Sequence, residues 1–323
     1  HWMRNFPLRE RRSRWWQNQL AESRLTLPVS VALFVGIRCL LLSAFDFATI
    51  CWSLLCILTA AIMLQLNVEH QLLRVRSHLP ESLFLLLSAI LPCQESMLSP
   101  MMSALCLMAG IGLLMPCYQN RDPVMYIFHA FLFLGVGSLF VPFMLVVALF
   151  FYVCLALLMR AFSWRGFWAG VVGFLTPYWC WLMWEVCLGD VSRMLAYLST
   201  QWQSMRADEA VLISLPHVRL LLVWLLMLFL SMVGIIHYMR KRYEDKIRTR
   251  MMLYVFVYVT VLLHVAFLLY PEQRSQLLAM MPVAVSPLVA HYWATIGGRV
   301  GLVILWVAFL GWLASLLHAL GWL

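Results

Sequence analysis

A small set of ionisable residues lies within, or at the ends of, stretches that are otherwise apolar. They are Arg38, Asp46, Glu185, Arg219 and His264. A charged group inside a bilayer is costly, so residues of this kind are functional candidates. Arginine binds phosphate through paired hydrogen bonds, and a carboxylate can take a proton from a reacting group. These residue types could therefore bind a phosphate-bearing substrate and act on it as a general base.

The composition places these residues in a membrane protein. Hydrophobic residues make up 64% of the 323 residues and charged residues 11%, whereas a soluble domain carries about 25% charged residues. The formal net charge is +9, but the charges lie at the ends of apolar stretches. This arrangement argues against a nucleic-acid partner and indicates the lipid bilayer as the partner.

The apolar stretches predict an all-α polytopic transmembrane bundle of about eleven helices. The first apolar run after Tyr126 is too long for one crossing of roughly 20 residues, so we divide it at Pro142. The segment 82–92 is short and is either a tilted crossing or a re-entrant piece. The helices are expected over about 25–45, 47–68, 82–92, 97–117, 124–159 (two helices), 167–188, 217–237, 251–270, 276–294 and 300–321.

Two further segments complete the predicted organisation. Residues 1–24 are rich in arginine and form a basic amphipathic cytoplasmic segment, or alternatively a mobile tail. Residues 25–323 form a single transmembrane domain. The long polar loop 189–215 has apolar residues at helical spacing, which predicts a short interfacial helix there.

The distribution of basic residues predicts the orientation. With the N-terminus in the cytoplasm, eighteen basic residues lie on the cytoplasmic side and four on the opposite side. Cytoplasmic loops carry an excess of lysine and arginine, so this split favours a cytoplasmic N-terminus. It also favours a full crossing by 82–92, because otherwise the basic run 240–250 would lie outside.

With this orientation, the ionisable residues fall in the outer third of the bilayer. Arg38 lies about seven residues, or roughly 10 Å, inside the outer end of its helix. A polar cavity that opens outward would explain why the positions all fall on one side. The alternative is structural: Arg38 and Glu185 form an ion pair, and Arg219 extends its side chain to the headgroups.

The remaining polar residues carry no recognisable catalytic motif. His129, His291 and His318 are isolated on apolar helices and are interpreted as packed polar residues. The nine cysteines form no C-x-x-C pair and are interpreted as small hydrophobic residues. No set of residues has metal-ligand spacing, so no metal site is predicted, and the cofactor is unknown.

Three segments resemble the helix patterns of the GT-C glycosyltransferases. They are GIRCLLLSAFD (36–46), LFLGVGSLFVPFMLVVALFF (132–151) and GFLTPYWCWLMW (173–184). The resemblance implies a lipid-linked sugar donor and an acidic catalytic base on the outer side, often with a divalent metal. Asp46 would be that base by position. The turn after the first helix has only a few residues, which implies a shortened outer domain.

A second resemblance covers more of the chain. FHAFLFLGVGSLFVPF (128–143) followed by FSWRGFWAGVVGFLTPY (162–178) is similar to an uncharacterised multi-pass membrane family of Bacteroidota. This resemblance implies the inner membrane of a Gram-negative envelope and brings no established activity.

Three classes of function remain open. The first is an enzyme, or a degenerate enzyme, that handles polyprenyl-phosphate-linked sugars at the periplasmic face. Arg38 and Arg219 would face the phosphate, His264 would line the substrate site, and Asp46 or Glu185 would act as base. The second is a non-catalytic membrane subunit that binds other envelope proteins. The third is a transporter, which the absence of a detectable repeat disfavours.

Overall fold

The computed structural model describes Ser23 and residues 25–41, 47–73, 77–91, 98–205, 217–296 and 299–320. These residues form twelve α-helices, three 3₁₀ turns and no strand. The α-helices are α3 (Thr26–Leu41), α4 (Phe47–His70), α5 (Leu79–Ala89), α6 (Leu98–Leu114), α7 (Val124–Phe140), α8 (Met144–Leu157), α9 (Trp164–Leu188), α10 (Ser192–Ser204), α12 (Val218–Lys241), α13 (Ile247–Leu269), α14 (Arg274–Thr295) and α15 (Arg299–Ala319). The 3₁₀ turns are η2 (Met115–Cys117), η3 (Arg242–Glu244) and η4 (Pro271–Gln273).

Seven helices in the described part are long and apolar enough to cross a membrane. They are α4, α6 with η2, α9, α12 with η3, α13, η4 with α14, and α15. Four more apolar helices, α3, α5, α7 and α8, have 11 to 17 residues each. By length and composition, the protein is a helical membrane protein.

The described helices fall on the predicted ranges. The long run after Tyr126 is divided as expected, because α7 ends at Phe140, α8 begins at Met144, and Pro142 lies in the turn between them. Several boundaries differ by three or four residues: α12 ends at Lys241 rather than at 237, α13 begins at Ile247 rather than at 251, and α5 begins at Leu79 rather than at Ser82. Pro80 fits the first turn of a helix, and Glu81 is buried inside α5 instead of lying in a polar loop. The predicted segment 1–24 lies outside the described residues, apart from Ser23.

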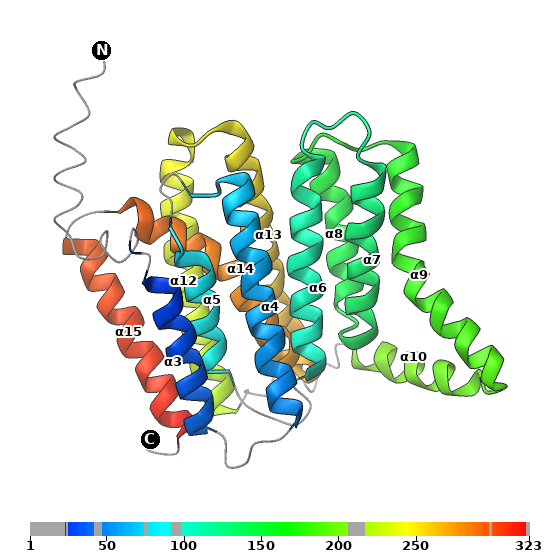
Figure 1. Ribbon diagram of the computed structural model, residues 1–323, viewed down its shortest axis with the longest axis horizontal. Helices are drawn as coiled ribbons and strands as arrows, with labels where there is room; N and C mark the ends of the chain where they lie inside the picture. The colour runs from blue at the N-terminus through cyan, green and yellow to red at the C-terminus, as the bar shows by residue number, and fades with distance from the viewer. Residues whose placement is uncertain are drawn as a thin grey trace.

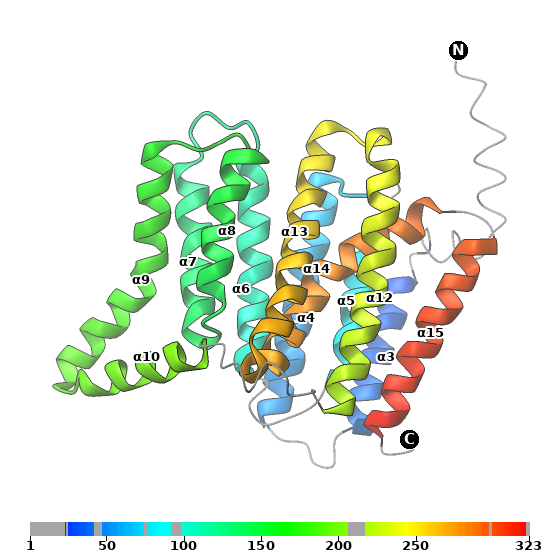
Figure 2. The ribbon, with the colours of Figure 1, turned by 180° about the vertical axis from the view of Figure 1, so that it is seen from behind.

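Helix α14 is the centre of the larger part of the bundle. Nearly all its residues are buried, and it packs against α5, α6, α12 and α13. Figure 1 shows α3 and α15 at one end of the molecule and α9 at the other, and the view from behind agrees (Figure 2). The short α5 is enclosed by α3, α4 and α14, so its ends depend on polar partners from its neighbours.

Helices α7 and α9 cross at very short range through glycines. A Cβ atom on Gly135 would lie 2.4 Å from the carbonyl oxygen of Phe174, and one on Gly173 would lie 2.3 Å from the carbonyl oxygen of Phe128. Small residues at such crossings let helix backbones approach each other, as in many membrane bundles. The glycines of this segment therefore bring α9 against α7.

Helix α9 lies at the end of the molecule that is opposite α3 and α15 (Figures 1 and 2). Ser163 caps its start, since its Oγ accepts a hydrogen bond from the Gly166 amide, and Gly189, which has a φ of 76°, caps its end. Its second half leans outward (Figures 1 and 2), and Pro177 within the helix removes a backbone hydrogen bond, a common cause of such a bend. Helix α10 then runs back across the end of the bundle, where the polar loop predicts a helix.

Candidate functional site

Arg38 joins three helices at one end of the bundle. Its side chain is almost fully buried, and Cζ lies 3.5 Å from the centroid of the Trp52 ring on α4. Nη1 donates to the carbonyl oxygen of Leu91, just after α5, at 3.4 Å. The end of a helix carries partial negative charge on its unpaired carbonyl groups, which a nearby cation stabilises. Arg38 therefore has a structural partner at the C-terminal end of α5.

Asp46, the predicted catalytic base, lies outside the described residues. It directly precedes Phe47, the first residue of α4, and α3 ends at Leu41, one turn beyond Arg38. Its role as a base remains a prediction.

An apolar groove of about 270 Å³ lies beside α3 and α5, on the side of Arg38 and Leu91 toward the start of each helix. The side chains that line it come from five helices and none is charged. They are Leu33, Leu83, Leu86, Leu87, Leu230, Trp293, Leu305, Ala308, Phe309 and Trp312. The Trp312 indole N–H donates to the Leu86 carbonyl oxygen at 2.8 Å, so this polar group is satisfied. The groove offers a hydrocarbon surface to any occupant.

Glu185 lies at the other end of the molecule, on the outward-leaning half of α9. It is buried, and Oε1 accepts a hydrogen bond from the Trp181 indole N–H at 3.0 Å. Within the described part of the chain, Oε2 has no hydrogen-bond partner. The Trp181 ring packs against Tyr197 of α10, whose hydroxyl donates to the Leu139 carbonyl oxygen at the end of α7. Glu185 is thus held in the corner between α9 and α10.

The turn into α10 is stabilised by local polar contacts. The Ser192 hydroxyl donates to the Asp190 carboxylate, and Arg193 lies 2.9 Å from the same carboxylate. Both contacts favour the charged form and hold the pKa of Asp190 below its usual value. These residues fix the corner beside Glu185 but are themselves exposed.

His264 and Arg219 lie on neighbouring helices, α13 and α12. His264 is buried, with Nδ1 2.8 Å from the Thr260 carbonyl oxygen and Nε2 3.5 Å from Ser231 Oγ. Because the carbonyl oxygen can only accept, Nδ1 carries the proton. Arg219 is partly exposed in the first turn of α12.

The structure does not gather the predicted residues into one site. Arg38 lies on α3 and Glu185 on α9, and these helices stand at opposite ends of the molecule in both views (Figures 1 and 2). The alternative interpretation, an ion pair between Arg38 and Glu185, is therefore wrong. His264 lies between α13 and α12, where it contacts Ser231, and Arg219 lies in the first turn of α12.

A buried aspartate–histidine pair, at the opposite end of the helices from Arg38, was not predicted. Asp245 follows η3, and its Oδ2 lies 3.1 Å from His291 Nε2 on α14, with both side chains only 1% exposed. His237 of α12 lies beside them and contacts Thr295 Oγ1 at 2.6 Å. In the sequence, Asp245 lies within the basic run 240–250. The two adjacent acidic residues Glu244 and Asp245 inside that run were the signal that could have revealed it. His291 is packed as expected.

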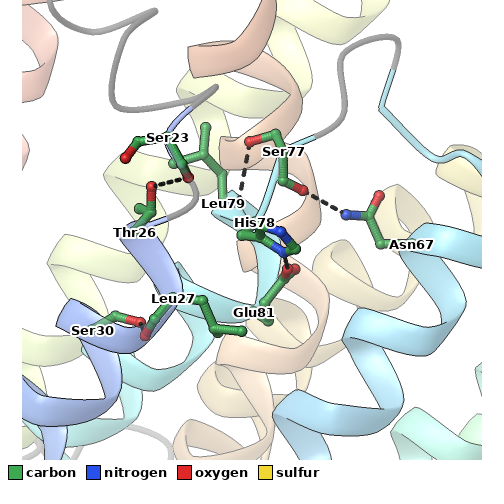
Figure 3. A network of polar contacts seen from close by, with 9 residues as sticks. All are labelled: Ser23, Thr26, Leu27, Ser30, Asn67, Ser77, His78, Leu79 and Glu81. Carbon is green, nitrogen blue, oxygen red and sulfur yellow. Dashed lines mark hydrogen bonds and ion pairs between the residues drawn. The ribbon is translucent and has the colours of Figure 1, made fainter.

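A second unpredicted network stabilises the start of α5 (Figure 3). The carboxylate of Glu81 is fully buried and lies 2.9 Å from His78 Nδ1. The Ser77 hydroxyl accepts from the Leu79 amide, and the Asn67 amide of α4 donates to the Ser77 carbonyl oxygen. Figure 3 shows His78 turned toward Glu81 between these contacts. Both ends of α5 thus have polar partners: this network at its start and Arg38 at its end.

No family model, no curated protein and no solved structure matches the chain. Among the described residues, no group of three or more histidine, cysteine, aspartate or glutamate side chains could hold a metal ion. The class of helical membrane protein therefore rests on the helices and their composition.

Proposed function

We propose that the protein handles a polyprenyl-phosphate-linked sugar at the periplasmic face of a bacterial inner membrane. In this proposal the chain crosses the bilayer eleven times from a cytoplasmic N-terminus and is a GT-C-like bundle with a shortened outer domain. It belongs to the Bacteroidota membrane family named above. The hydrocarbon chain of the lipid occupies the groove between α3, α5 and α15.

The observation that carries the proposal is the position of the apolar groove relative to Arg38. Leu33 lines the groove and precedes Arg38 by five residues on α3, which is about 7.5 Å along a helix. Leu87 lines the groove on α5, and Leu91, which accepts from Arg38, follows four residues later. A lipid chain in the groove would therefore extend toward the positive charge of Arg38.

The roles of the polar residues follow from this placement. Arg38 would attract the lipid phosphate through its charge, in surroundings where few water molecules screen it. Asp46 would act as the general base, since it lies in the short connection between α3, which carries Arg38, and α4. Glu185 lies too far away to share this site.

The test is mass spectrometry of lipids that co-purify with the protein in mild detergent. We expect a polyprenyl-phosphate species in the wild type, and much less of it when the groove is filled by Ala308→Phe or narrowed by Leu33→Trp. Leu33 is 49% exposed, so the second change tests the groove even where the first fails to fold. Ala156→Phe, at an exposed alanine on α8, is the matched control and should leave the lipid unchanged.

Two outcomes would overturn the proposal. One is a wild-type preparation that contains only ordinary diacyl lipids. The other is a polyprenyl species that Leu33→Trp and Ala308→Phe leave at the wild-type amount in folded protein.

A second candidate function is a non-catalytic subunit of an envelope assembly. It is supported by the local partners of the predicted residues: Arg38 contacts Trp52 and Leu91, and Glu185 accepts from Trp181. A stoichiometric protein partner that survives detergent extraction, with no polyprenyl lipid, would favour this function over the first.

A further inference from the structure

A polar cavity of about 540 Å³ lies on the side of the bundle opposite Arg38. Its walls come from the end of α4 and the following turn, and from η3 and the start of α13. They are Glu69, His70, Gln71, Leu73, Glu244, Asp245, Lys246, Arg248 and Thr249. The volume is within the usual range for a small-ligand site.

The cavity lies where long apolar helices end. Helix α4 ends at His70, the long apolar segment Val218–Glu244 ends beside it, and α13 begins at Ile247. The ends of long apolar helices lie in the interfacial region of a bilayer, outside the hydrocarbon core. A lipid headgroup is therefore a ligand that this cavity meets at high local concentration.

Charges of both signs line the cavity, and several are fixed in place. The Asp245 carboxylate is held by His291 from α14. Arg248 Nη2 lies 3.2 Å from His70 Nδ1, a contact that connects the two walls. Glu69 and Glu244 add negative charge, whereas Lys246 adds positive charge. A purely anionic or purely cationic ligand would meet like charge on part of this surface.

The positive charges are grouped at the start of α13. Lys246 immediately precedes the helix and Arg248 lies in its first turn, and both are exposed. The first turn contains no acidic residue, and no side chain caps it. The first amide groups of a helix and a nearby lysine or arginine together favour a phosphate group. Here the amide groups only add to a site that the cavity and its charged side chains define.

We propose that this cavity binds a zwitterion that carries one ammonium group and one phosphate group, the chemistry of a phosphatidylethanolamine headgroup. The phosphate lies against Lys246 and Arg248, and the ammonium group faces the carboxylates of Glu69 and Glu244. The proposal is separate from the function suggested above, because it concerns the opposite end of the helices and a different lipid.

The experiment measures lipid binding to the purified protein through the shift of its unfolding temperature. The probes are phosphatidylethanolamine, phosphatidylglycerol, soluble O-phosphoethanolamine and inorganic phosphate. We expect the two ethanolamine compounds to stabilise the protein and the other two to do so far less. A stronger effect of the lipid than of O-phosphoethanolamine identifies a membrane source, and equal effects identify a soluble one. Either result supports the zwitterion site.

The variants separate the two halves of the site. Lys246→Ala should weaken ethanolamine binding about tenfold, as expected for the loss of one charge-assisted hydrogen bond. Glu69→Gln should reduce the preference for phosphatidylethanolamine over phosphatidylglycerol. Both residues are exposed, so neither change should prevent folding. Arg165→Ala removes an exposed cation on α9, outside the cavity, and should leave binding unchanged.

The proposal is overturned by either of two results. The first is equal stabilisation by phosphatidylglycerol and phosphatidylethanolamine, or by inorganic phosphate and O-phosphoethanolamine. The second is ethanolamine binding that Lys246→Ala reduces no more than Arg165→Ala does.

Discussion

The guanidinium of Arg38 lies over the indole of Trp52, with Cζ 3.5 Å from the ring centroid. The pair joins α3 to α4 in surroundings from which water is largely excluded. A desolvated cation over tryptophan stabilises a structure by about 2 kcal/mol. This contact accounts for a buried arginine that the sequence could only mark as a candidate for function.

A double-mutant cycle would measure this contact. We expect Arg38→Met and Trp52→Leu, each of which removes the cation–π contact, to lower the free energy of unfolding in detergent. The double variant should lose about 2 kcal/mol less than the sum of the single changes, because the contact can be lost only once. Additive losses would show that the two side chains are adjacent without being coupled.

The close crossing of α7 and α9 gives a second prediction. Gly135→Ala would place a Cβ atom 2.4 Å from the Phe174 carbonyl oxygen, which is backbone and cannot move aside alone. We expect a loss of about 1–3 kcal/mol, typical of overpacking. Gly36→Ala is the control, because its Cβ would meet nothing within 4 Å. Alanine favours a helix by up to about 1 kcal/mol over glycine, so the control should be neutral or stabilising. Thermal unfolding of both variants would check the difference.

One hydroxyl contributes directly to the attachment of α10. Tyr197 donates to the Leu139 carbonyl oxygen, and its ring packs against Trp181. Tyr197→Phe keeps the ring and removes the hydrogen bond, at a cost of about 1 kcal/mol. Amide exchange within α10 should therefore become about fivefold faster. Tyr126→Phe, at an exposed tyrosine on α7, should leave exchange in α10 unchanged.

The buried pair of Asp245 and His291 makes a prediction about stability. Asp245→Ala would leave His291 without this acceptor at a place that is 1% exposed, and we expect a loss of about 1–3 kcal/mol. Asp245→Asn keeps an acceptor oxygen and should lose less. Asp122→Ala removes an exposed acidic residue and provides the control in the same unfolding experiment. Equal, small losses in all three variants would contradict the structural role of the pair.

The sequence predicted the helices well because hydropathy and breaking residues act locally. Pro142 marked the turn between α7 and α8, and the apolar spacing in the loop 189–215 marked α10. Hydropathy and helix-breaking residues indicate only how far along its helix a residue lies, and not which helices are its neighbours. Arg38 and Glu185 are both predicted to lie in the outer third of the bilayer, but α3 and α9 lie at opposite ends of the molecule. Lateral placement depends on which helix faces fit together, as Gly135 and Gly173 show for α7 and α9.

The sequence could not predict which polar side chains pair with each other in the fold. Asp245 lies in a run of basic residues and His291 stands alone on α14, and only the fold brings them within 3.1 Å. In the same way, Glu81 belongs to a polar stretch in the sequence, whereas α5 buries it beside His78. Such contacts depend on packing rather than on local pattern.

The orientation of the bundle can be tested by labelling single cysteines. The turn between α12 and α13 lies at one end of the helices and α10 at the other (Figures 1 and 2). Tyr243 is 73% exposed in that turn, and Ser199 is exposed on α10. Tyr243→Cys and Ser199→Cys would be made in a chain whose nine native cysteines are replaced. The excess of basic residues beside Tyr243 predicts that this turn is cytoplasmic. A membrane-impermeant maleimide should then label Cys at 199 in intact spheroplasts, and Cys at 243 only after the membrane is opened. The reverse labelling pattern would contradict this orientation. It would place Arg38 near the cytoplasmic face of the membrane.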